Sequence, residues 1–378
     1  MKPLCRAVPS SITMSLDKTA KELKASGRDV INLTAGQVDL PMPQSGKDAV
    51  IAALNANATC YVPAAGSADV KIAVRERMGW QDGSILISAG AKPLLSAAIA
   101  CLTGSGDEVL LPTPCYTSYP EMVRLAGAAP IPVAGDPDNR FTVSKATLEQ
   151  AVSSCTKALL FNNPVNPTGT VYRSEELRMI VDFCIEHDLW LVADEVYGEF
   201  VYDGSFVSLY EFADARERLI LVNSASKAYA MAGLRLGYAV APKAVADAIA
   251  GYLSHMLGCP CSLSERAAIA VLNGEDCSDL RDTFRRRRDV LYPALAAIPG
   301  IRVEKSIGAF YFWLDIRETG MDDVAFCRDL IEREGVALTP GSAFLCPGYV
   351  RLAYTHPEPV LLDAAERMQR FLDAISYQ

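Results

Sequence analysis

From residue 84 onward, short apolar runs of strand character alternate with segments of helical spacing. This alternation is typical of repeated strand–helix–strand units, in which mostly parallel strands form one sheet flanked by helices. We therefore predict an α/β fold built on a mostly parallel sheet. The seven expected strands are 85–88, 108–111, 129–133, 158–162, 190–193, 219–223 and 236–240, and the expected helices include 93–102, 119–125, 145–152, 174–186 and 243–257.

Different patterns flank this region on both sides. A helical pattern at 15–27 and a short strand at 29–33 precede two prolines between residues 40 and 45, which interrupt regular structure. Beyond Gly274 come a long charged helix, strands near 301–304 and 309–314, and a C-terminal helix, a succession that suits an α+β unit. A chain of 378 residues is long enough for two cores. We predict a large domain of residues 45–275 and a smaller, discontinuous domain of 1–44 and 276–378.

The charge balance indicates small-molecule ligands. A formal net charge of −9 disfavours nucleic acid as a partner, because nucleic-acid binders normally carry a basic surface. The apolar stretches are too short to span a bilayer, and the first fifteen residues lack the apolar run of a secretory signal. We expect a cytoplasmic protein.

Three local features do not by themselves indicate a site. The 11 cysteines have no regular spacing, which disfavours a disulfide framework. The three histidines are scattered and no second cysteine cluster accompanies Cys259 and Cys261, so no metal site is expected. The basic run at 284–289 is interpreted as a solvated helix face, which is the usual meaning of a short charge run.

Polar residues follow four of the expected strands. Ligands of open parallel sheets sit outside the carboxyl ends of the strands, so these residues are the first candidates for a site. A strand-to-helix turn at residues 90–92 would offer free backbone N–H groups to a phosphate, although it could also be only a tight turn. The other three groups are the segment 163–169, the residue Asp194, and the run Ser224-Ala225-Ser226-Lys227.

The run that ends at Lys227 has the most specific chemistry. Its hydroxyls and Arg235, eight residues after the lysine, suit a phosphate dianion, while a desolvated lysine among cations becomes nucleophilic. A carbonyl cofactor that carries a phosphate needs both. Asp194 could partner a protonated pyridine nitrogen, or it could be an ordinary turn residue. Lys92 is a rival to Lys227 but lacks its flanking hydroxyls and arginine, and Lys47 has no such context.

Together these segments resemble the class I/II, fold-type I aminotransferases. The resemblance runs from Asn32-Leu33-Thr34-Ala35-Gly36 to Val350-Arg351-Leu352-Ala353-Tyr354 and includes Asn166-Pro167-Thr168-Gly169, Asp194-Glu195-Val196-Tyr197, Ser224-Ala225-Ser226-Lys227 and Gly233-Leu234-Arg235-Leu236-Gly237. It implies the fold-type I α/β architecture and the cofactor pyridoxal 5'-phosphate (PLP). It also implies transfer of an amino group from an L-amino acid to a 2-oxo acid, in a homodimer.

The resemblance also implies a role for each residue. Lys227 looks like the catalytic lysine that carries PLP as a Schiff base, Asp194 like the partner of the pyridine nitrogen, and Arg351 like the clamp on the substrate α-carboxylate. The other implied contacts are Tyr197 and Asn166 to the cofactor's phenolic oxygen, Tyr116 stacked on its ring, Gly36 and Asn166 beside the substrate, and Gly90, Ala91, Lys92, Ser224, Ser226, Arg235 and a second subunit's Tyr61 around the phosphate.

Departures from the family pattern leave the substrate and the outcome open. Val38 stands where many relatives have proline, and Leu345 stands where a glycine is common. Pro93 in the phosphate turn is physically harmless, because proline is tolerated in a first helical turn. No second arginine for a dicarboxylate side chain is identified. The alternative function is a PLP enzyme of the same fold that catalyses β- or γ-elimination or replacement, cyclisation or oxidation. A PLP-sensing regulator is disfavoured, since the family motifs begin by Asn32.

Overall fold

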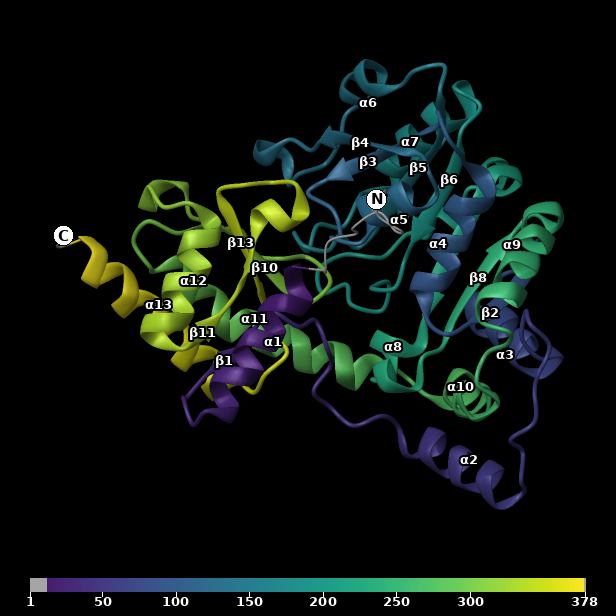
Figure 1. Ribbon diagram of the computed structural model, residues 1–378, viewed down its shortest axis with the longest axis horizontal. Coiled ribbons are helices and arrows are strands. Elements are labelled where there is room, and N and C mark those ends of the chain that lie inside the picture. Colours follow the sequence, from purple (N-terminus) through teal and green to yellow (C-terminus); the bar gives the residue numbers. More distant parts are fainter. Residues whose placement is uncertain (1–11, 377–378) are drawn as a thin grey trace, which may run out of the picture.

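The computed structural model describes residues 12–376, so predictions that concern residues 1–11 lie outside the described part. These include most of the segment in which no secretory signal was expected. Figure 1 shows two bodies, a larger one around a broad sheet and a smaller one that contains β10 and β13. Among the described residues, no helix is both long and apolar enough to cross a membrane.

The larger body is built on a sheet that, within residues 12–376, has seven strands in the order β2-β8-β7-β6-β5-β3-β4. In this sheet β8 is antiparallel to β2 and β7, and the other neighbours are parallel. The predicted α/β fold with a mostly parallel sheet is therefore confirmed. The strands are β2 (Ser84–Ser88), β3 (Glu108–Thr113), β4 (Ala129–Ala134), β5 (Thr156–Asn162), β6 (Trp190–Asp194), β7 (Leu219–Ser224) and β8 (Gly237–Ala241).

Helices cover both faces of this sheet, which explains why its central strands are apolar along their whole length. One face packs against α4 (Ala91–Leu102), α5 (Tyr119–Leu125) and α9 (Lys243–Met256). The opposite face packs against α3 (Ala68–Met78), α6 (Lys145–Ala151), α7 (Ser174–Glu186) and α10 (Ser262–Gly274), and α2 (Gln44–Asn55) lies on α10. The strand ends are thus fixed by two separate apolar layers.

The smaller body has its own core, which joins residues from both ends of the chain. Its sheets are the antiparallel β12-β13-β10-β9 and the parallel pair β1-β11. The strands are β1 (Ile31–Asn32), β9 (Arg302–Val303), β10 (Tyr311–Asp315), β11 (Val336–Ala337), β12 (Thr339–Pro340) and β13 (Tyr349–Ala353), and the helices are α1 (Ile12–Ala25), α11 (Ser278–Ala296), α12 (Asp323–Glu334) and α13 (Glu358–Ser376). Separate cores support our proposed division into 45–275 and 1–44 with 276–378, which stays a proposal.

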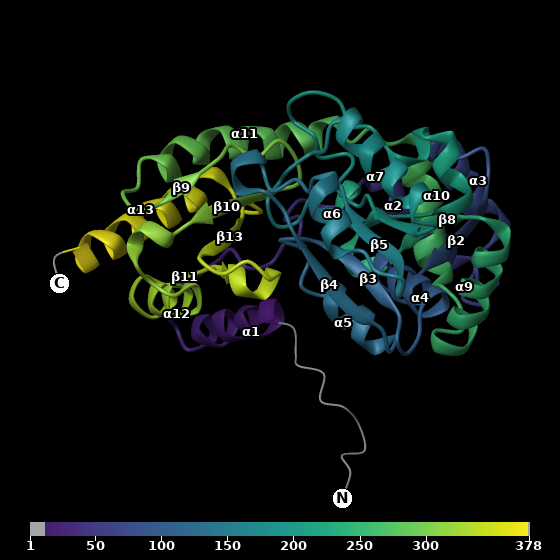
Figure 2. The same ribbon diagram turned by 90° about the horizontal axis from the view of Figure 1, so that it is seen from above.

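Helix α11 lies along one side of the molecule in Figure 2, and it carries the basic run. The expectation of a solvated face was wrong for two of its four arginines. Arg287 and Arg288 are only 5% and 1% exposed, because each pairs with an acidic residue far away in the sequence. The helix therefore has a buried charged side that a local charge pattern does not reveal.

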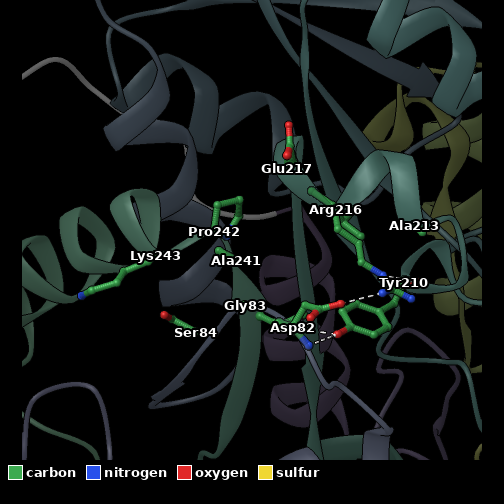
Figure 3. Close-up of a pocket in the computed structure, with 12 residues that line it drawn as sticks. Asp82, Gly83, Ser84, Tyr210, Ala213, Arg216, Glu217, Ala241, Pro242 and Lys243 are labelled. Atoms are coloured by element: carbon green, nitrogen blue, oxygen red, sulfur yellow. Dashed lines mark hydrogen bonds and ion pairs between the residues drawn. The ribbon is translucent and has the colours of Figure 1, made fainter.

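A cavity of about 560 Å³ opens at the amino ends of β2 and β7, away from the strand ends where ligands of such sheets bind (Figure 3). Two of its charged groups, Arg216 and Asp82, pair with each other. Arg216 donates to Asp82 at 2.7 Å and to the Tyr210 carbonyl at 2.9 Å, and its guanidinium lies 4.3 Å from the centre of the Tyr210 ring. We assign this cavity no ligand.

Candidate active site

A second cavity, of about 320 Å³, lies at the carboxyl ends of β5, β6 and β7. This is where a parallel sheet is expected to bind its ligand. The structure brings together at this cavity most of the residues singled out from the sequence, which are Gly36, Ala91, Lys92, Tyr116, Asn166, Asp194, Tyr197, Ser224, Ser226, Lys227, Arg235 and Arg351. Arg351 comes from β13 of the smaller body, so both bodies build the site.

Asp194 is the last residue of β6, and its carboxylate is buried at the floor of the cavity. Tyr119 Oη donates to its Oδ2 at 2.7 Å, and the Val196 amide donates to its Oδ1 at 3.2 Å. Burial nevertheless raises the pKa of Asp194 to about 6, because the charged form is poorly solvated. A cationic group placed against this carboxylate would be strongly stabilised.

Lys227 lies in the short helix α8 (Ala225–Ala228), directly after β7. Its Nζ donates to the Gly36 carbonyl at 2.5 Å, across the boundary between the two bodies. Burial, together with the nearby cations Arg351 and Arg235, lowers the pKa of Lys227 to about 8. An amine with this pKa is partly neutral near neutral pH, which makes it both a nucleophile and a proton acceptor.

The turn from β2 into α4 forms a cradle for an anion. Helix α4 begins at Ala91, so the first amides of the helix have no acceptor within it. Gly90 has φ of +98°, and a Cβ there would lie 2.4 Å from Arg235 Nη2, so only glycine allows this approach. Ser224 and Ser226 stand beside the cradle with their Oγ atoms 2.8 Å apart. Backbone amides, hydroxyls and a guanidinium are donors that suit a phosphate.

Arg351 is 2% exposed and reaches across the cavity to the large body. Its Nη1 donates to Asn166 Oδ1 at 2.9 Å, and its Nη2 donates to the Thr34 carbonyl at 2.5 Å. The guanidinium also lies over the rings of Tyr311 and Phe344. Asn166 is held in turn by its own amide, which donates to Asn162 Oδ1 at 2.7 Å. A guanidinium oriented by so many contacts is suited to bind a carboxylate in one defined geometry.

Two tyrosines of the site were missed by sequence reasoning. Tyr119 is the first residue of α5 and bonds to Asp194, while Tyr311 is the first residue of β10 and its Oη lies 2.7 Å from that of Tyr197. Burial, and next the neighbouring Tyr311, raises the pKa of Tyr197 well above its usual range, so Tyr197 stays a protonated donor. Only the positions of the two tyrosines at element ends beside the expected cleft could have indicated them.

Two of the predicted residues, Gly90 and Tyr61, do not line the cavity, whereas Tyr116 does. Tyr116 lines the cavity with its ring centre 5.2 Å from Lys92 Nζ. Gly90 lies directly behind the cradle rather than on the cavity wall. Tyr61 is 96% exposed and is not among the residues that line this cavity. An exposed position is what a residue would have if it contributed to a second subunit.

Comparison with known proteins places this geometry in a family context. Residues 28–368 match the family model described as aminotransferase class I and II. The aspartate aminotransferase of Bacillus subtilis (strain 168) is 37% identical over 382 residues, which cover 97% of each protein. A probable aspartate/prephenate aminotransferase of Aquifex aeolicus is also 37% identical, over 97% of this chain and 96% of that protein.

Solved structures agree with the sequence relatives. The aspartate aminotransferase from Thermus thermophilus with maleate superposes with a TM-score of 0.93 at 35% identity, covering 98% of this chain and 100% of that one. An aspartate aminotransferase from Thermotoga maritima gives a TM-score of 0.92 at 34% identity, covering 97% and 98%. The likeness extends through both bodies and includes every strand that reaches the cavity.

Proposed function

The chain belongs to the class I and II aminotransferases, and from that membership we propose a role for each residue of the cavity and a class of substrate. The protein is a PLP-dependent aminotransferase. Elimination, replacement, cyclisation or oxidation is not favoured, because the relatives that match over their full lengths are named aminotransferases.

The residues of the cavity fit PLP. Asp194 offers a buried carboxylate that a protonated pyridine nitrogen would neutralise, and the Gly90 turn offers a cradle that a Cβ would close. We propose that the backbone amides of Ala91 and Lys92, the hydroxyls of Ser224 and Ser226, and the guanidinium of Arg235 bind the phosphate. Tyr116 stacks on the ring, and Tyr197 and Asn166 bind the phenolic oxygen. When bound, PLP acts as an electron sink for the charge that develops at the substrate Cα.

We assign the remaining chemistry to two side chains. Arg351 binds the α-carboxylate and thereby orients the amino acid, with Gly36 and Asn166 beside it. Lys227 would hold the cofactor through its Nζ, and the free Nζ would accept the proton from the substrate Cα. A pKa of about 8 suits this task, because a general base is most effective when its pKa lies near the working pH. The observation that carries the proposal is the meeting of Lys227, Asp194 and Arg351 in one cavity.

We propose a dicarboxylic amino acid, aspartate, as the donor. The relatives are named aspartate aminotransferases, and the Thermus structure carries maleate, a dicarboxylate. The cavity is lined by the cations Lys92, Lys227, Arg235 and Arg351 against one carboxylate, Asp194, so it favours anionic ligands. Because Lys227, Arg235 and Arg351 already have roles, we assign the exposed side chain of Lys92 to the second carboxylate.

The donor assignment is tested by measuring kcat/KM for aspartate and for alanine, with 2-oxoglutarate as acceptor and mass analysis of the keto acids. We expect oxaloacetate from aspartate and no product from a Lys227→Ala variant. Lys92→Ala should weaken transition-state binding of aspartate by about 1 to 2 kcal/mol, which lowers its kcat/KM roughly 5- to 30-fold, and should leave kcat/KM for alanine unchanged. Lys243→Ala is the matched control, because this lysine also begins a helix and is exposed but lies outside the cavity. Equal losses for both donors would contradict the role of Lys92.

We further propose that the chain acts as a homodimer in which Tyr61 contributes to the cofactor phosphate site of the partner. The 96% exposure of Tyr61 supports this, as does the presence of exposed apolar side chains nearby in sequence, Ile51, Leu54 and Ile72. Light scattering of the holoenzyme should give twice the chain mass, and Tyr61→Phe should weaken PLP binding without dissociating the dimer. A cytoplasmic location stays a prediction from the sequence.

A further inference from the structure

The basic run on α11 has no place in the function described so far, although two of its arginines are buried. Arg287 and Arg288 point to different partners from successive positions of the helix. Burial of a guanidinium is costly unless its charge and its N–H groups are matched. The partners therefore indicate which parts of the molecule this helix holds in place.

Arg287 forms a two-pronged pair with Asp39. Its Nη1 lies 2.7 Å from Oδ1 and its Nη2 lies 2.9 Å from Oδ2, and the partners are 248 positions apart in the sequence. The side chain of Arg287 is 5% exposed and that of Asp39 is 26% exposed, so the pair is largely shielded from water. The guanidinium also lies 5.0 Å from the centre of the Phe284 ring. Parallel hydrogen bonds of this kind fix orientation as well as distance.

Asp39 belongs to a segment that reaches the reacting lysine. Three residues earlier, the Gly36 carbonyl accepts the hydrogen bond from Lys227 Nζ at 2.5 Å, and Gly36 and Gln37 line the cavity. Gly36 is so close to Tyr311 that a Cβ would lie 1.8 Å from its Oη. Between these points Val38 is 6% exposed and packs in the core of the smaller body. Within the described part of the chain the amides of residues 36 to 39 donate no backbone hydrogen bond, so side chains hold the segment.

We propose that Arg287 is a positioning residue for the transamination reaction, acting through Asp39 to hold the segment 36–39 against Lys227 and the substrate side of the cavity. The segment is fixed at Val38 by packing and at Asp39 by the ion pair, and Gly36 at its amino end meets Lys227. Arg287 itself does not line the cavity. Its effect on the reaction is therefore indirect, through the place of the Gly36 carbonyl.

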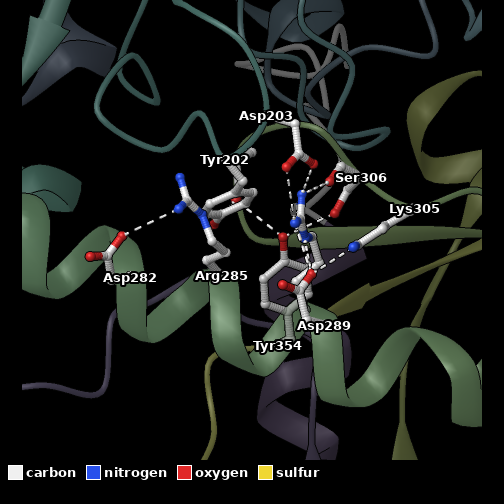
Figure 4. A network of polar contacts seen from close by, with 10 residues as sticks. Tyr202, Asp203, Asp282, Arg285, Asp289, Lys305, Ser306 and Tyr354 are labelled. Carbon is white, nitrogen blue, oxygen red and sulfur yellow. Dashed lines mark hydrogen bonds and ion pairs between the residues drawn. The ribbon is translucent and has the colours of Figure 1, made fainter.

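The neighbouring Arg288 keeps α11 itself in place, which gives the pair a rigid base. Its partners Asp203, Asp289 and Ser306 lie together in the network of Figure 4. Its Nη1 lies 2.5 Å from Asp203 Oδ2 and donates to the Ser306 carbonyl at 2.9 Å, while Nε donates to Asp289 at 2.8 Å. Tyr354 Oη lies 3.0 Å from Ser306 Oγ and completes the network. Arg288 thus joins α11 to Asp203, between β6 and β7, and to Ser306, in the loop before β10. Arg287 joins the same helix to the segment over the site.

Three variants test the proposal in the holoenzyme. Arg287→Met keeps a long stem against Phe284 and removes the charge, and Asp39→Asn removes the partner charge with little change of shape. Arg286→Met is the matched control, since Arg286 is the preceding residue of α11 but is exposed and donates to Thr283 of its own helix. For each variant, KM and kcat are measured with the donor that the wild-type enzyme uses best. Thermolysin cleavage before Val38 is followed by mass spectrometry, which reports on the segment independently of activity.

We expect Arg287→Met and Asp39→Asn each to raise KM by about tenfold, since misplacing a substrate-binding segment by a fraction of an ångström has effects of this order. Cleavage before Val38 should accelerate in both, while other bonds keep their wild-type rates. The double variant should be no worse than either single variant, because both remove the same contact. The proposal is overturned if both folded variants match Arg286→Met in KM and in cleavage before Val38, or if their effects on KM add in the double variant.

Discussion

Replacing Asp194 with asparagine tests whether the ionised carboxylate of Asp194 lowers the free energy of unfolding of the cofactor-free protein. Burial raises the pKa of Asp194 to about 6 from an ordinary value of 3.8. Since one pH unit corresponds to about 1.4 kcal/mol, the ionised carboxylate should lower the stability of the folded protein by about 3 kcal/mol above pH 6. Asparagine has nearly the same shape and no charge, so Asp194→Asn should remove this cost.

The sign of the pH dependence follows from which state holds the proton more tightly. The pKa of Asp194 is higher in the folded protein than in the unfolded chain, so the folded state binds the proton better. Its contribution to stability is fully present below the unfolded pKa and is lost as the pH rises through about 6. The wild-type protein should therefore lose stability relative to Asp194→Asn between about pH 4 and pH 6, and the difference should then stay level.

The measurement is urea unfolding of both cofactor-free proteins at one fixed protomer concentration, at several values from about pH 4 to pH 8. The quantity of interest is the difference in free energy of unfolding between wild type and variant, because other titrating groups cancel in it. A constant offset is expected from the hydrogen bonds that asparagine cannot accept. A difference that does not change over this pH range would refute the claim that Asp194 is poorly solvated.

Three further predictions concern the same cavity. Gly90→Ala should raise the Kd for PLP by roughly tenfold or more in equilibrium dialysis, because strain at positive φ costs about 1 to 3 kcal/mol. Gly251→Ala is the control and should leave the Kd unchanged, because a Cβ at Gly251 would meet open space. Covalent uptake of PLP by the cofactor-free protein should accelerate as the pH rises through about 8, the pKa of Lys227, and a midpoint near 10 in stopped-flow absorbance would contradict this. Arg351→Lys should raise KM for the donor by about 30-fold or more in steady-state assays, since lysine cannot make the two-pronged contact; an unchanged KM would remove Arg351 from the carboxylate site.

Much of the site could be predicted because its chemistry lies at strand ends. Strands buried on both faces appear as unbroken apolar runs, so all seven were located to within about two residues. Four of these runs are followed by polar groups, and parallel topology brings those groups to one edge of the sheet. This is why Asp194 and Lys227, 33 positions apart, could be expected in one cavity from the sequence.

The parts that could not be predicted depend on contacts between distant residues. In the sequence Tyr119 and Tyr311 look like ordinary core residues. Only the fold shows that the Tyr119 hydroxyl contacts Asp194 and that the Tyr311 hydroxyl contacts Tyr197. Arg287 belongs to a basic run of the kind that usually indicates a solvent-exposed helix face. Its partner Asp39 lies in another part of the chain, and no periodicity links the two. Local patterns give the elements, while the pairing of buried charges requires the tertiary structure.

Asp194 and Lys227 show why this site needs its cofactor. Burial shifts both groups toward neutrality, raising the pKa of the acid and lowering the pKa of the amine, and the two sit in one cavity. A pyridinium nitrogen would give the carboxylate the countercharge that it lacks, and covalent attachment would remove the amine from the set of unsolvated charges. Binding of PLP should therefore stabilise the fold beyond the contacts that its phosphate makes. The unfavourable free energy of burying Asp194 and Lys227 without PLP should therefore add to the affinity for PLP, which would interact with both groups.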